Sequence, residues 1–561
     1  MKFRNWEIGG FDRDAAVKLC REGVNPLVSV FLTSRGVTRI EDARAMLEDG
    51  TAQIHDPFMM ADMDRAVSRI TAAVENGERI AIYGDYDVDG MTSCALLALW
   101  LRSQTADYEI YIPGRFDEGY GLNHAALDSL KSRGVGLVIT VDCGITAIAE
   151  AEYARGLDMG LVITDHHECR DELPIADAVL DPKRPDCGYP HKTLAGVGVV
   201  FKLVCALERG VDCDEMFRRY GDLVAIGTIA DVMPVVGENR ELIRRGLRTL
   251  NHNPRLGLGK LLGETYIERG RINSATVGFA IAPRLNAAGR MGLTGLSVEI
   301  LLTEDENEAQ RLTAELTQLN TERRRLEMEM YKEARSMLQD SAPDGPIVLA
   351  RRGWYQGVTG IVAAKMSEQF FLPAIIISID DGIGRGSCRS FGAFGLYDAL
   401  RSCEDLLLNY GGHEKAAGVT IAEENIEEFR RRITMYYLDN IKTAPRPGLR
   451  LDFIVEKPEL LTVRNVEALK SLEPFGSGNP PPYLCIKDAV LSSANSIGSG
   501  KHSRLKLEKQ GKSLDCVYFA MPFEKLGLSE GMLVDVAFEP QINEFRGRNV
   551  QLNVLDIRSA E

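Results

Sequence analysis

The chain has 561 residues, 45% hydrophobic and 26% charged, which is the composition of a globular protein with roughly three to five domains. A formal net charge of −15 excludes a protein coated in positive charge, such as a DNA-packing protein, but allows a local basic groove. Residues 446–561 hold equal numbers of basic and acidic residues, so the negative excess lies before them. Cysteines without a Cys-x-x-Cys pair, no apolar leader and no membrane-length apolar run predict a cytoplasmic protein with reduced thiols and no membrane segment.

Residues 1–75 are expected to form a helical extension, and we find no chemistry in them. From residue 76 to residue 300, short apolar strands alternate with helices. The clearest strands are Ile80–Tyr83, Gly136–Val141 and Met159–Thr164. This alternation predicts a mostly parallel α/β sheet with helices on both faces.

Residues 301–342 are expected to form one long amphipathic helix. Apolar side chains recur there at helical spacing among charged residues: Leu312, Leu316, Leu319, Leu326 and Met330. The plainest role for such a helix is to connect two lobes, and a coiled-coil dimer is the alternative. We expect the connector, and with it a monomer.

Strand and helix patterns resume at residues 343–442, where Ile347–Leu349 and Pro373–Ile377 predict a second, smaller α/β lobe. After a turn-rich linker, residues 449–561 contain short apolar segments separated by Gly, Pro and Asn, which is typical of a small β-barrel. The expected fold class is therefore α/β: a parallel-sheet lobe, a long connecting helix, a smaller α/β lobe and a C-terminal β-barrel.

Carboxylates follow the predicted strands of the first lobe. Asp85, Asp87 and Asp89 occupy alternate positions directly after one strand. This Asp-x-Asp-x-Asp-Gly run is also found at the start of an EF-hand. We reject that interpretation, because the twelfth position holds Leu96 instead of a bidentate Glu and the preceding element is a strand.

Three more segments carry possible metal ligands. Asp142 and the run Asp165-His166-His167 each follow a strand, and Asp231 ends an apolar helix. Taken singly, an aspartate after a strand is more often a helix cap, and paired histidines can be surface residues. Because parallel strands end at one edge of a sheet, the segments together indicate a metal site.

Carboxylates with one or two imidazoles suit two divalent cations, Mn²⁺ or Mg²⁺, and the absence of cysteine ligands argues against structural zinc. Two such cations would activate water and neutralise charge on phosphoryl oxygens. The residues therefore predict metal-assisted phosphoester hydrolysis.

A second set of residues is suited to phosphate binding. The backbone of Gly411-Gly412-His413 could cup an anion, although a glycine turn before a strand is the simpler explanation. Ser387 and Arg389 alternate on a predicted strand, so both can face one side. Arg284 and Asn286 are expected in a polar turn spanning Pro283–Arg290, and Arg115 follows a strand. Each arginine alone could be only a solvated charge.

The C-terminal region carries a basic segment, Gly500–Lys512, followed by Tyr518 and Phe519, with Phe545 near Arg546 and Arg548 further on. Basic grooves with aromatic platforms are how small barrels hold single strands. A solvated basic hairpin with core aromatics is an equally good explanation from the sequence.

Together these segments resemble the DHH phosphoesterase superfamily and, within it, its single-strand-specific DNA exonucleases. The resemblance covers nearly the whole chain. It rests on Asp85-Tyr-Asp-Val-Asp-Gly90, Val141-Asp-Cys-Gly144, Asp165-His-His167, Ala230-Asp-Val-Met-Pro234, Pro283-Arg-Leu-Asn-Ala-Ala-Gly289 and Gly411-Gly-His-Glu-Lys-Ala-Ala-Gly418. It implies a DHH catalytic domain at 76–300, a connecting helix at 301–342, a DHHA1 domain at 343–442 and an OB-fold at 449–561.

The resemblance also implies roles for individual residues. The two cations would be held by Asp85, Asp87, Asp89, Asp142, His166 and Asp231. His167 would face the scissile phosphate, and Asp165 would orient the histidine pair as the second catalytic residue. Substrate phosphates would be contacted by Arg115, Arg284, Asn286, Ser387, Arg389, Gly411, Gly412 and His413.

The implied activity is removal of 5′-mononucleotides from single-stranded DNA, 5′ to 3′, in recombination and repair beside a helicase and a single-strand-binding protein. The polarity comes from the resemblance alone. One alternative is a phosphodiesterase of oligoribonucleotides or cyclic dinucleotides, against which the C-terminal barrel argues. Another is a non-catalytic single-strand-binding replication factor, against which the full ligand set argues.

Overall fold

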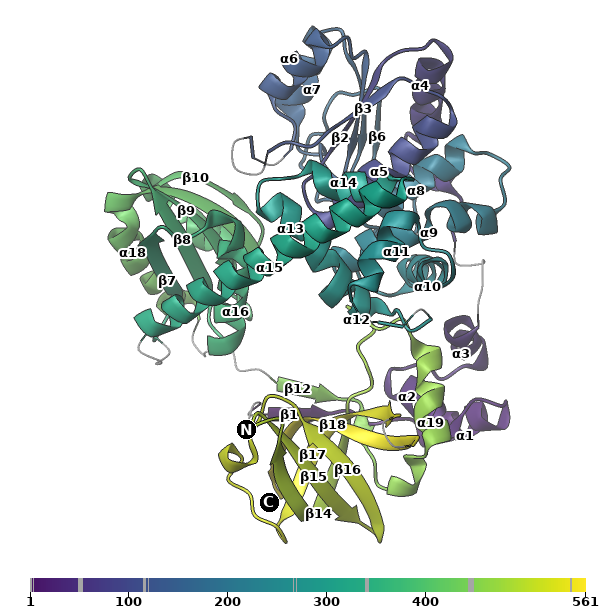
Figure 1. The fold of residues 1–561 in the computed structure, drawn as a ribbon, viewed down its shortest axis with the longest axis vertical. Helices are drawn as coiled ribbons and strands as arrows, with labels where there is room; N and C mark the ends of the chain where they lie inside the picture. The colour runs from purple at the N-terminus through teal and green to yellow at the C-terminus, as the bar shows by residue number, and fades with distance from the viewer. Residues whose placement is uncertain are drawn as a thin grey trace. The chain divides into compact units, whose positions relative to one another are not determined.

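The computed structural model describes residues 3, 5–48, 54–114, 118–119, 121–265, 267–268, 270–338, 343–441, 448–544 and 547–560. The chain divides into two compact units (Figure 1). One comprises Thr51–Pro445 with Gly476–Asn479, and the other comprises Met1–Gly50, Arg446–Phe475 and Pro480–Glu561. Among the described helices, none combines the length and the apolar character needed to cross a membrane.

The larger unit begins with a five-stranded parallel sheet in the order β3-β2-β4-β5-β6. Its strands are β2 (Ile80–Gly84), β3 (Tyr108–Tyr111), β4 (Leu137–Val141), β5 (Gly160–Thr164) and β6 (Ala178–Leu180). All five strands end at the same edge, so the residues that follow them gather there. The predicted parallel sheet is confirmed.

Helices cover both faces of this sheet. One face packs on α4 (Met63–Glu75), α5 (Val88–Ser103) and α8 (Gly196–Leu207), and the other on α6 (His124–Ser132) and α7 (Ile148–Gly156). Further helices extend the first core: α9 (Cys213–Ala230), α10 (Gly237–His252), α11 (Leu256–Gly263), α12 (Ser274–Thr276), the π-helix η3 (Val277–Ile281), α13 (Ala282–Arg290) and α14 (Gly295–Leu302).

The predicted polar turn at Pro283–Arg290 is wrong, because these residues form most of α13. Proline is well tolerated in the first turn of a helix, where its missing N–H has no intrahelical partner, and Pro283 lies there. Ala287 and Ala288 are buried, so the helix also contributes to the core.

The long helix α15 (Glu306–Met337) connects the two lobes of the larger unit (Figure 1). Leu312 and Leu316 belong to the core of the parallel lobe, whereas Met330 and Ala334 belong to the core of the next lobe. The apolar residues of α15 are thus used within the chain, which favours the connector over a coiled coil.

The second lobe is a five-stranded sheet in the order β10-β11-β9-β8-β7, in which only β7 and β8 are parallel. Its elements are β7 (Ile347–Arg352), α16 (Gln356–Phe370), β8 (Ala374–Asp380), β9 (Ile383–Arg389), α17 (Leu396–Arg401), β10 (Leu407–Gly412), β11 (Ala416–Ala422) and α18 (Ile426–Asn440). The expected small α/β lobe is confirmed.

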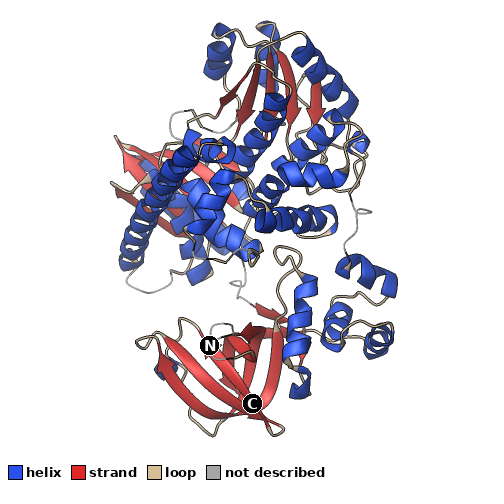
Figure 2. Ribbon diagram, turned by 45° about the vertical axis from the view of Figure 1, so that its right-hand side comes forward, coloured by secondary structure: helices blue, strands red, loops and turns tan. Residues whose placement is uncertain are grey.

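The other unit is built on a closed barrel, which Figure 2 shows with the helices of the same unit. The barrel strands are β14 (Leu484–Ile497), β15 (His502–Lys509), β16 (Lys512–Tyr518), β17 (Leu533–Asn543) and β18 (Asn549–Ser559), closed by pairing of β14 with β17. Beside them lie β13 (Phe453–Ile454) and α19 (Val463–Ala468). The predicted barrel is confirmed.

The expected N-terminal extension is divided between the two units. Strand β1 (Asn5–Ile8) pairs in parallel with β12 (Gly448–Leu451), and the helices α1 (Arg13–Arg21), α2 (Pro26–Ser34) and α3 (Ile40–Leu47) follow. Leu27 and Phe31 of α2 share one core with Leu505 and Phe538 of the barrel. In contrast, α4 packs on the parallel sheet of the larger unit.

Candidate metal centre

The first group of carboxylates lies at the turn between β2 and α5. Asp87 caps α5, because its Oδ1 accepts hydrogen bonds from the backbone N–H groups of Asp89 and Gly90 at 2.9 and 3.1 Å. Asp85 and Asp89 are buried on either side of this cap. Their positions follow from the strand-turn-helix geometry that the sequence predicts.

Asp142 follows β4 and has a left-handed backbone, with a φ of 61°. This conformation is uncommon outside glycine, although aspartate tolerates it better than most residues, and such positions cluster at functional sites. Asp231 is the C-terminal cap of α9, and the next residue, Val232, also has a positive φ of 57°. A β-branched residue in this region is a genuine outlier, and it turns the chain sharply away after Asp231.

Asp165 orients the segment that follows β5. Its Oδ1 accepts hydrogen bonds from the backbone of His166 and His167 at 2.7 and 3.1 Å, and its Oδ2 accepts one from the backbone of Ile145 at 2.9 Å. The Nδ1 atom of His167 lies 2.7 Å from the same Oδ1. These contacts hold both histidines in one arrangement.

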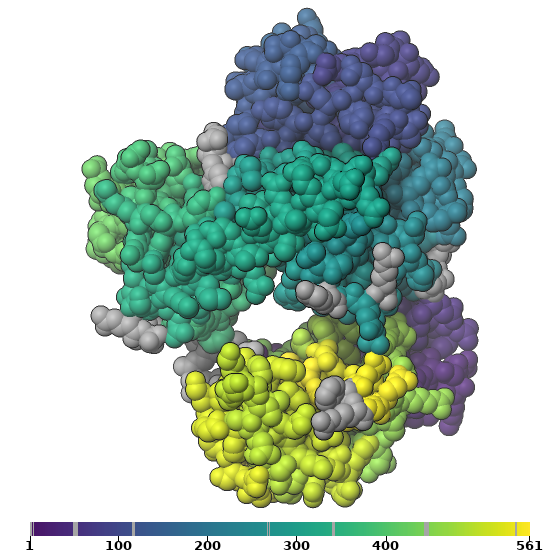
Figure 3. Space-filling view, viewed as in Figure 1, coloured from purple at the N-terminus to yellow at the C-terminus, as the bar shows by residue number. Residues whose placement is uncertain are grey.

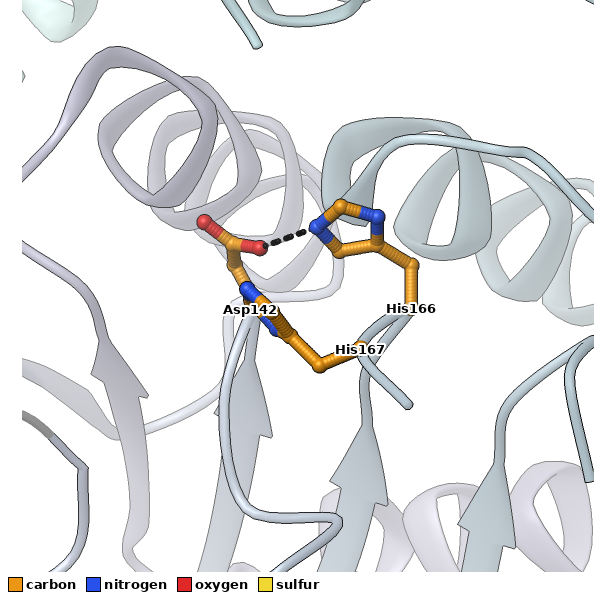
Figure 4. Close-up of side chains that lie close together, drawn as sticks. All are labelled: Asp142, His166 and His167. Carbon is orange, nitrogen blue, oxygen red and sulfur yellow. Dashed lines mark ion pairs between the residues drawn. The ribbon is translucent and has the colours of Figure 1, made fainter. Parts of the chain in front are cut away.

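The segments converge on His166. Its Nε2 lies 3.0 Å from Asp142 Oδ1, 3.5 Å from Asp231 Oδ2 and 3.8 Å from Asp89 Oδ2, and Figure 4 shows it directed at Asp142. Three overlapping groups each place their ligand atoms within 4.8 Å of one another: Asp85, Asp87 and Asp142; Asp89, His166 and Asp231; Asp142, His166 and His167. All six residues that the resemblance assigns to the metals are brought together.

The electrostatics of this cluster are unfavourable without a cation. Burial, reinforced by neighbouring carboxylates, raises the pKa of Asp89 and Asp142 well above the usual range. Burial and the charge of Asp87 raise the pKa of Asp231 to about 7. Bound cations would let these carboxylates stay ionised.

The two histidines titrate in opposite directions. Burial and the charge of His167 lower the pKa of His166 to about 3, so its ring is neutral and can act as a metal ligand. Burial alone would also lower the pKa of His167, but the hydrogen bond and charge of Asp165 raise it to about 9. The neutral Nε2 of His166 lies only 3.0 Å from a carboxylate oxygen of Asp142, and both are buried. Such a set of nitrogen and oxygen ligands fits Mn²⁺ or Mg²⁺.

The second lobe presents the predicted phosphate-binding residues on β9 and in the β10–β11 turn. A Cβ at Gly360 of α16 would lie 3.5 Å from both Ser387 Oγ and Arg389 Nη2, so these two side chains share a face, as the alternation predicts. Burial lowers the pKa of His413, and the charges of His167 and Arg389 lower it further. The turn is therefore within electrostatic reach of His167.

Comparison with known proteins identifies the family. The family model of the DHH family, N-terminal domain, matches residues 79–228, the DHHA1 domain matches residues 344–438, and the RecJ OB domain matches residues 452–556. The single-stranded-DNA-specific exonuclease RecJ of Bacillus subtilis is 41% identical over 564 residues, which cover 99% of this chain and 71% of the relative. The chain belongs to the RecJ family.

Crystal structures of RecJ family members agree with the fold. RecJ from Thermus thermophilus, solved in complex with Mn²⁺, has a TM-score of 0.84 and 31% identity, covering 99% of this chain and 80% of that one. The complex of the same protein with Mg²⁺ has a TM-score of 0.79 and 30% identity, covering 99% and 79%.

Within this RecJ fold, the sequence did not reveal the role of the N-terminus of α8. The backbone N–H groups of Gly196 and Val197 donate to the two carboxylate oxygens of Asp89 at 2.6 and 2.9 Å. A helix N-terminus favours a carboxylate, so α8 fixes this candidate ligand. The glycines in Ala195-Gly-Val-Gly198 could have indicated that the backbone approaches another group closely here.

Two charged residues after β6, Asp181 and Lys183, were not singled out from the sequence. Asp181 is fully buried, and burial raises its pKa to about 7. Its Oδ1 accepts a hydrogen bond from the backbone of Lys183, whose ammonium lies 3.0 Å from Glu168. Asp181 follows a strand just as Asp142 does, so the same signal could have found it.

Other predicted residues have less defined surroundings. Arg284 donates from Nη1 to the carbonyl of Ala280 at 2.6 Å, and Asn286 is half-buried on α13. A Cβ at Gly289 would lie 2.7 Å from the carbonyl oxygen of Tyr86, so the end of α13 contacts the loop of Asp85 and Asp87. Arg115 lies outside the described residues.

The barrel separates the predicted aromatic residues. Tyr518 is buried, which fits the core explanation, whereas Phe519 is 56% exposed and its ring lies 5.6 Å from that of His502. Arg504 and Lys506 are exposed on β15. Arg548 pairs with Glu467, and Phe545 and Arg546 lie outside the described residues.

Proposed function

We propose that this chain is a metal-dependent exodeoxyribonuclease that removes 5′-mononucleotides from single-stranded DNA in the 5′-to-3′ direction. The observation that carries the proposal is the convergence of three acid–histidine groups at the carboxyl edge of the parallel sheet. Membership of a family whose members are named single-stranded-DNA-specific exonucleases supports the substrate. The Mn²⁺ and Mg²⁺ complexes of a family member support the choice of cations.

In this proposal the two cations are held by the six side chains described above: Asp85, Asp87, Asp89, Asp142, His166 and Asp231. When bound, they supply Lewis-acid stabilisation of phosphoryl oxygens and activation of water. Asp89 and Asp87 are fixed in advance, because the first accepts from the start of α8 and the second caps α5.

His167 is assigned to the scissile phosphate. Its ring is held by Asp165, and with a pKa of about 9 it carries a proton at neutral pH in the absence of cations. The positive charge of the protonated His167 ring would attract a phosphate oxygen. In this proposal the phosphates of the strand are contacted by Ser387, Arg389 and His413 of the second lobe, together with the backbone of Gly411 and Gly412 and with Arg284 and Asn286.

The test is a digest of one single strand labelled separately at its two ends, with and without Mn²⁺. We expect the 5′ label to be released at once as a mononucleotide and the 3′ label to pass through a ladder of shorter strands. Asp142→Ala and His166→Ala should each lower the rate at least about a hundredfold, because each removes a candidate cation ligand.

Two results would contradict the proposal. Cleavage of dinucleotides without degradation of long strands would favour a small-nucleotide phosphodiesterase, and strand binding without Mn²⁺-dependent release would favour a non-catalytic factor. The helicase and single-strand-binding partners implied by the resemblance stay predictions.

A further inference from the structure

Phe279 is an aromatic residue that the fold leaves in solvent. It lies in the π-helix η3 between Val277 and Ile281, which are fully buried, yet its own exposed fraction is 86%. Exposing a large apolar side chain forgoes the stabilisation of burial, and π-helical turns occur frequently at functional sites. In a protein that handles single strands, an exposed ring is suited to stack on a base.

The helix η3 lies next to an element of the metal centre. The helix packs against α9, and a Cβ at Gly278 would lie 3.9 Å from Cγ2 of Ile229, which is in the last turn before Asp231. The chain continues from η3 into α13, whose far end contacts the carbonyl of Tyr86. The turn that carries Phe279 thus packs against the end of α9, two residues before one candidate ligand, and leads into a helix that contacts the loop carrying the others.

Arg324 provides a positive charge on α15, which packs against α13. Other arginines of α15 have carboxylate partners: Arg311 pairs with Glu308 and Glu315, Arg323 with Glu327, and Arg325 with Glu322 and Glu329. Arg324 is exposed and has no carboxylate within ion-pair distance in the described part of the chain. In Figure 3 the teal-to-green segment that includes α15 lies at the surface of its unit.

Arg324 and Arg284 act on one another across the packed helices α13 and α15. Burial lowers the pKa of Arg284, the charge of Arg324 lowers it further, and Glu264 opposes this effect. The Nε of Arg284 is buried without a hydrogen-bond partner among the described residues. A bound phosphate would relieve the repulsion between these two guanidinium groups, because its negative charge attracts both.

We propose that Phe279 and Arg324 bind one nucleotide of the incoming strand, with the ring stacked on the base and Arg324 paired, together with Arg284, to the adjacent phosphate. The proposal rests on the function proposed above and adds a cause of strand selectivity. A base face is free to stack on Phe279 only when the strand is unpaired, because in a duplex both faces are covered by neighbouring pairs.

The experiment measures binding of a fluorescent single strand in EDTA, so that nothing is cleaved. Phe279→Ala should weaken binding about tenfold, and Phe279→Trp should restore it, because one stacked base contributes roughly that much. Arg324→Gln should also weaken binding and should lower the slope of log K against log salt by about 0.7, the value for one phosphate contact on a single strand. Phe279→Ala should leave that slope unchanged.

Arg325→Gln is the matched control, because it removes an equally exposed charge from the same helix that is already paired. It should bind as the wild type does. Thermal unfolding and Mn²⁺ binding check that each variant is folded. If Phe279→Ala and Arg324→Gln both bind the strand as tightly as the wild type, and the wild type degrades strands, this inference is wrong and the function proposed above still holds. Failure of the wild type to degrade strands would overturn the function proposed above.

Discussion

Asp142 and Gly196 are in such close contact that the glycine cannot carry a side chain. A Cβ at Gly196 would lie 2.7 Å from both the Cβ and the Oδ1 of Asp142. Gly196→Ala should therefore displace this candidate ligand and lower Mn²⁺ affinity and strand cleavage by about 10–100-fold. Gly198→Ala is the control, since a Cβ there would lie 3.4 Å from Leu194, an ordinary contact. Calorimetry with Mn²⁺ and cleavage rates measure both; equal behaviour of the two variants would refute the prediction.

The pKa of His167 depends on Asp165. In the metal-free protein it is about 9, because the hydrogen bond and charge of Asp165 outweigh burial. In Asp165→Asn the charged hydrogen-bond partner is lost, so the pKa of His167 should fall below 9, with only the charges of Asp231 and Asp85 left to oppose burial. NMR titration of the ring nitrogens in the metal-free protein measures this directly.

The sign of the linked stability change follows. A raised pKa means that protonated His167 stabilises the metal-free wild type fully below pH 6.5, and that this stabilisation is lost as the pH rises through about 9. In Asp165→Asn this loss should be smaller and should occur at a lower pH. A variant whose His167 still titrates near 9 would show that another group supports the proton.

At the scale of elements, α15 carries a buried ion pair at the point where it passes from one lobe to the other. Arg323 and Glu327 lie 2.8 Å apart and are 9% and 6% exposed, and Glu327 also pairs with Lys365 of α16. Glu327→Gln would leave a buried guanidinium without its carboxylate, so we expect a loss of about 3 kcal/mol in the free energy of unfolding.

Glu329→Gln is the control for this prediction, because it breaks the exposed pair with Arg325 on the same helix. Exposed pairs contribute little, so no resolvable change is expected. Urea denaturation measures both variants. If they lose equal stability, the buried pair is not what stabilises the junction between the lobes.

The alternating strands and helices of the parallel sheet could be predicted from the sequence. Runs such as Gly136–Val141 are apolar and are followed by an acid, and parallel strands end together at one edge, so the positions of Asp85, Asp142 and Asp165 followed from local pattern. The helix α13 was missed because its Pro, Asn and Gly residues are typical of turns, whereas burial of Ala287 and Ala288 favours the helix. The contact of Gly196 with Asp89 joins residues far apart in sequence, and local pattern does not report such contacts.

At the scale of the whole molecule, the association of the N-terminal segment with the barrel could not be predicted. Strand β1 pairs with β12, more than 400 residues away, and Leu27 packs in the barrel core. A short strand at the start of a chain carries no signal for so distant a partner. Deleting residues 449–561 would therefore also expose the apolar face of α2, so point variants test the barrel better than truncation does.

Exposed basic residues on β15 provide that test. Arg504 and Lys506 point outward while Leu505 and Leu507 fill the core, so both cations can be replaced without disturbing packing. The double variant Arg504→Gln/Lys506→Gln should bind long single strands more weakly, with a salt slope lower by about 1.4, because two phosphate contacts are lost. Cleavage of strands too short to reach the barrel should be unchanged. Arg21→Gln, an exposed charge on α1, is the control. Equal losses on short and long strands would contradict a separate strand-holding role for the barrel.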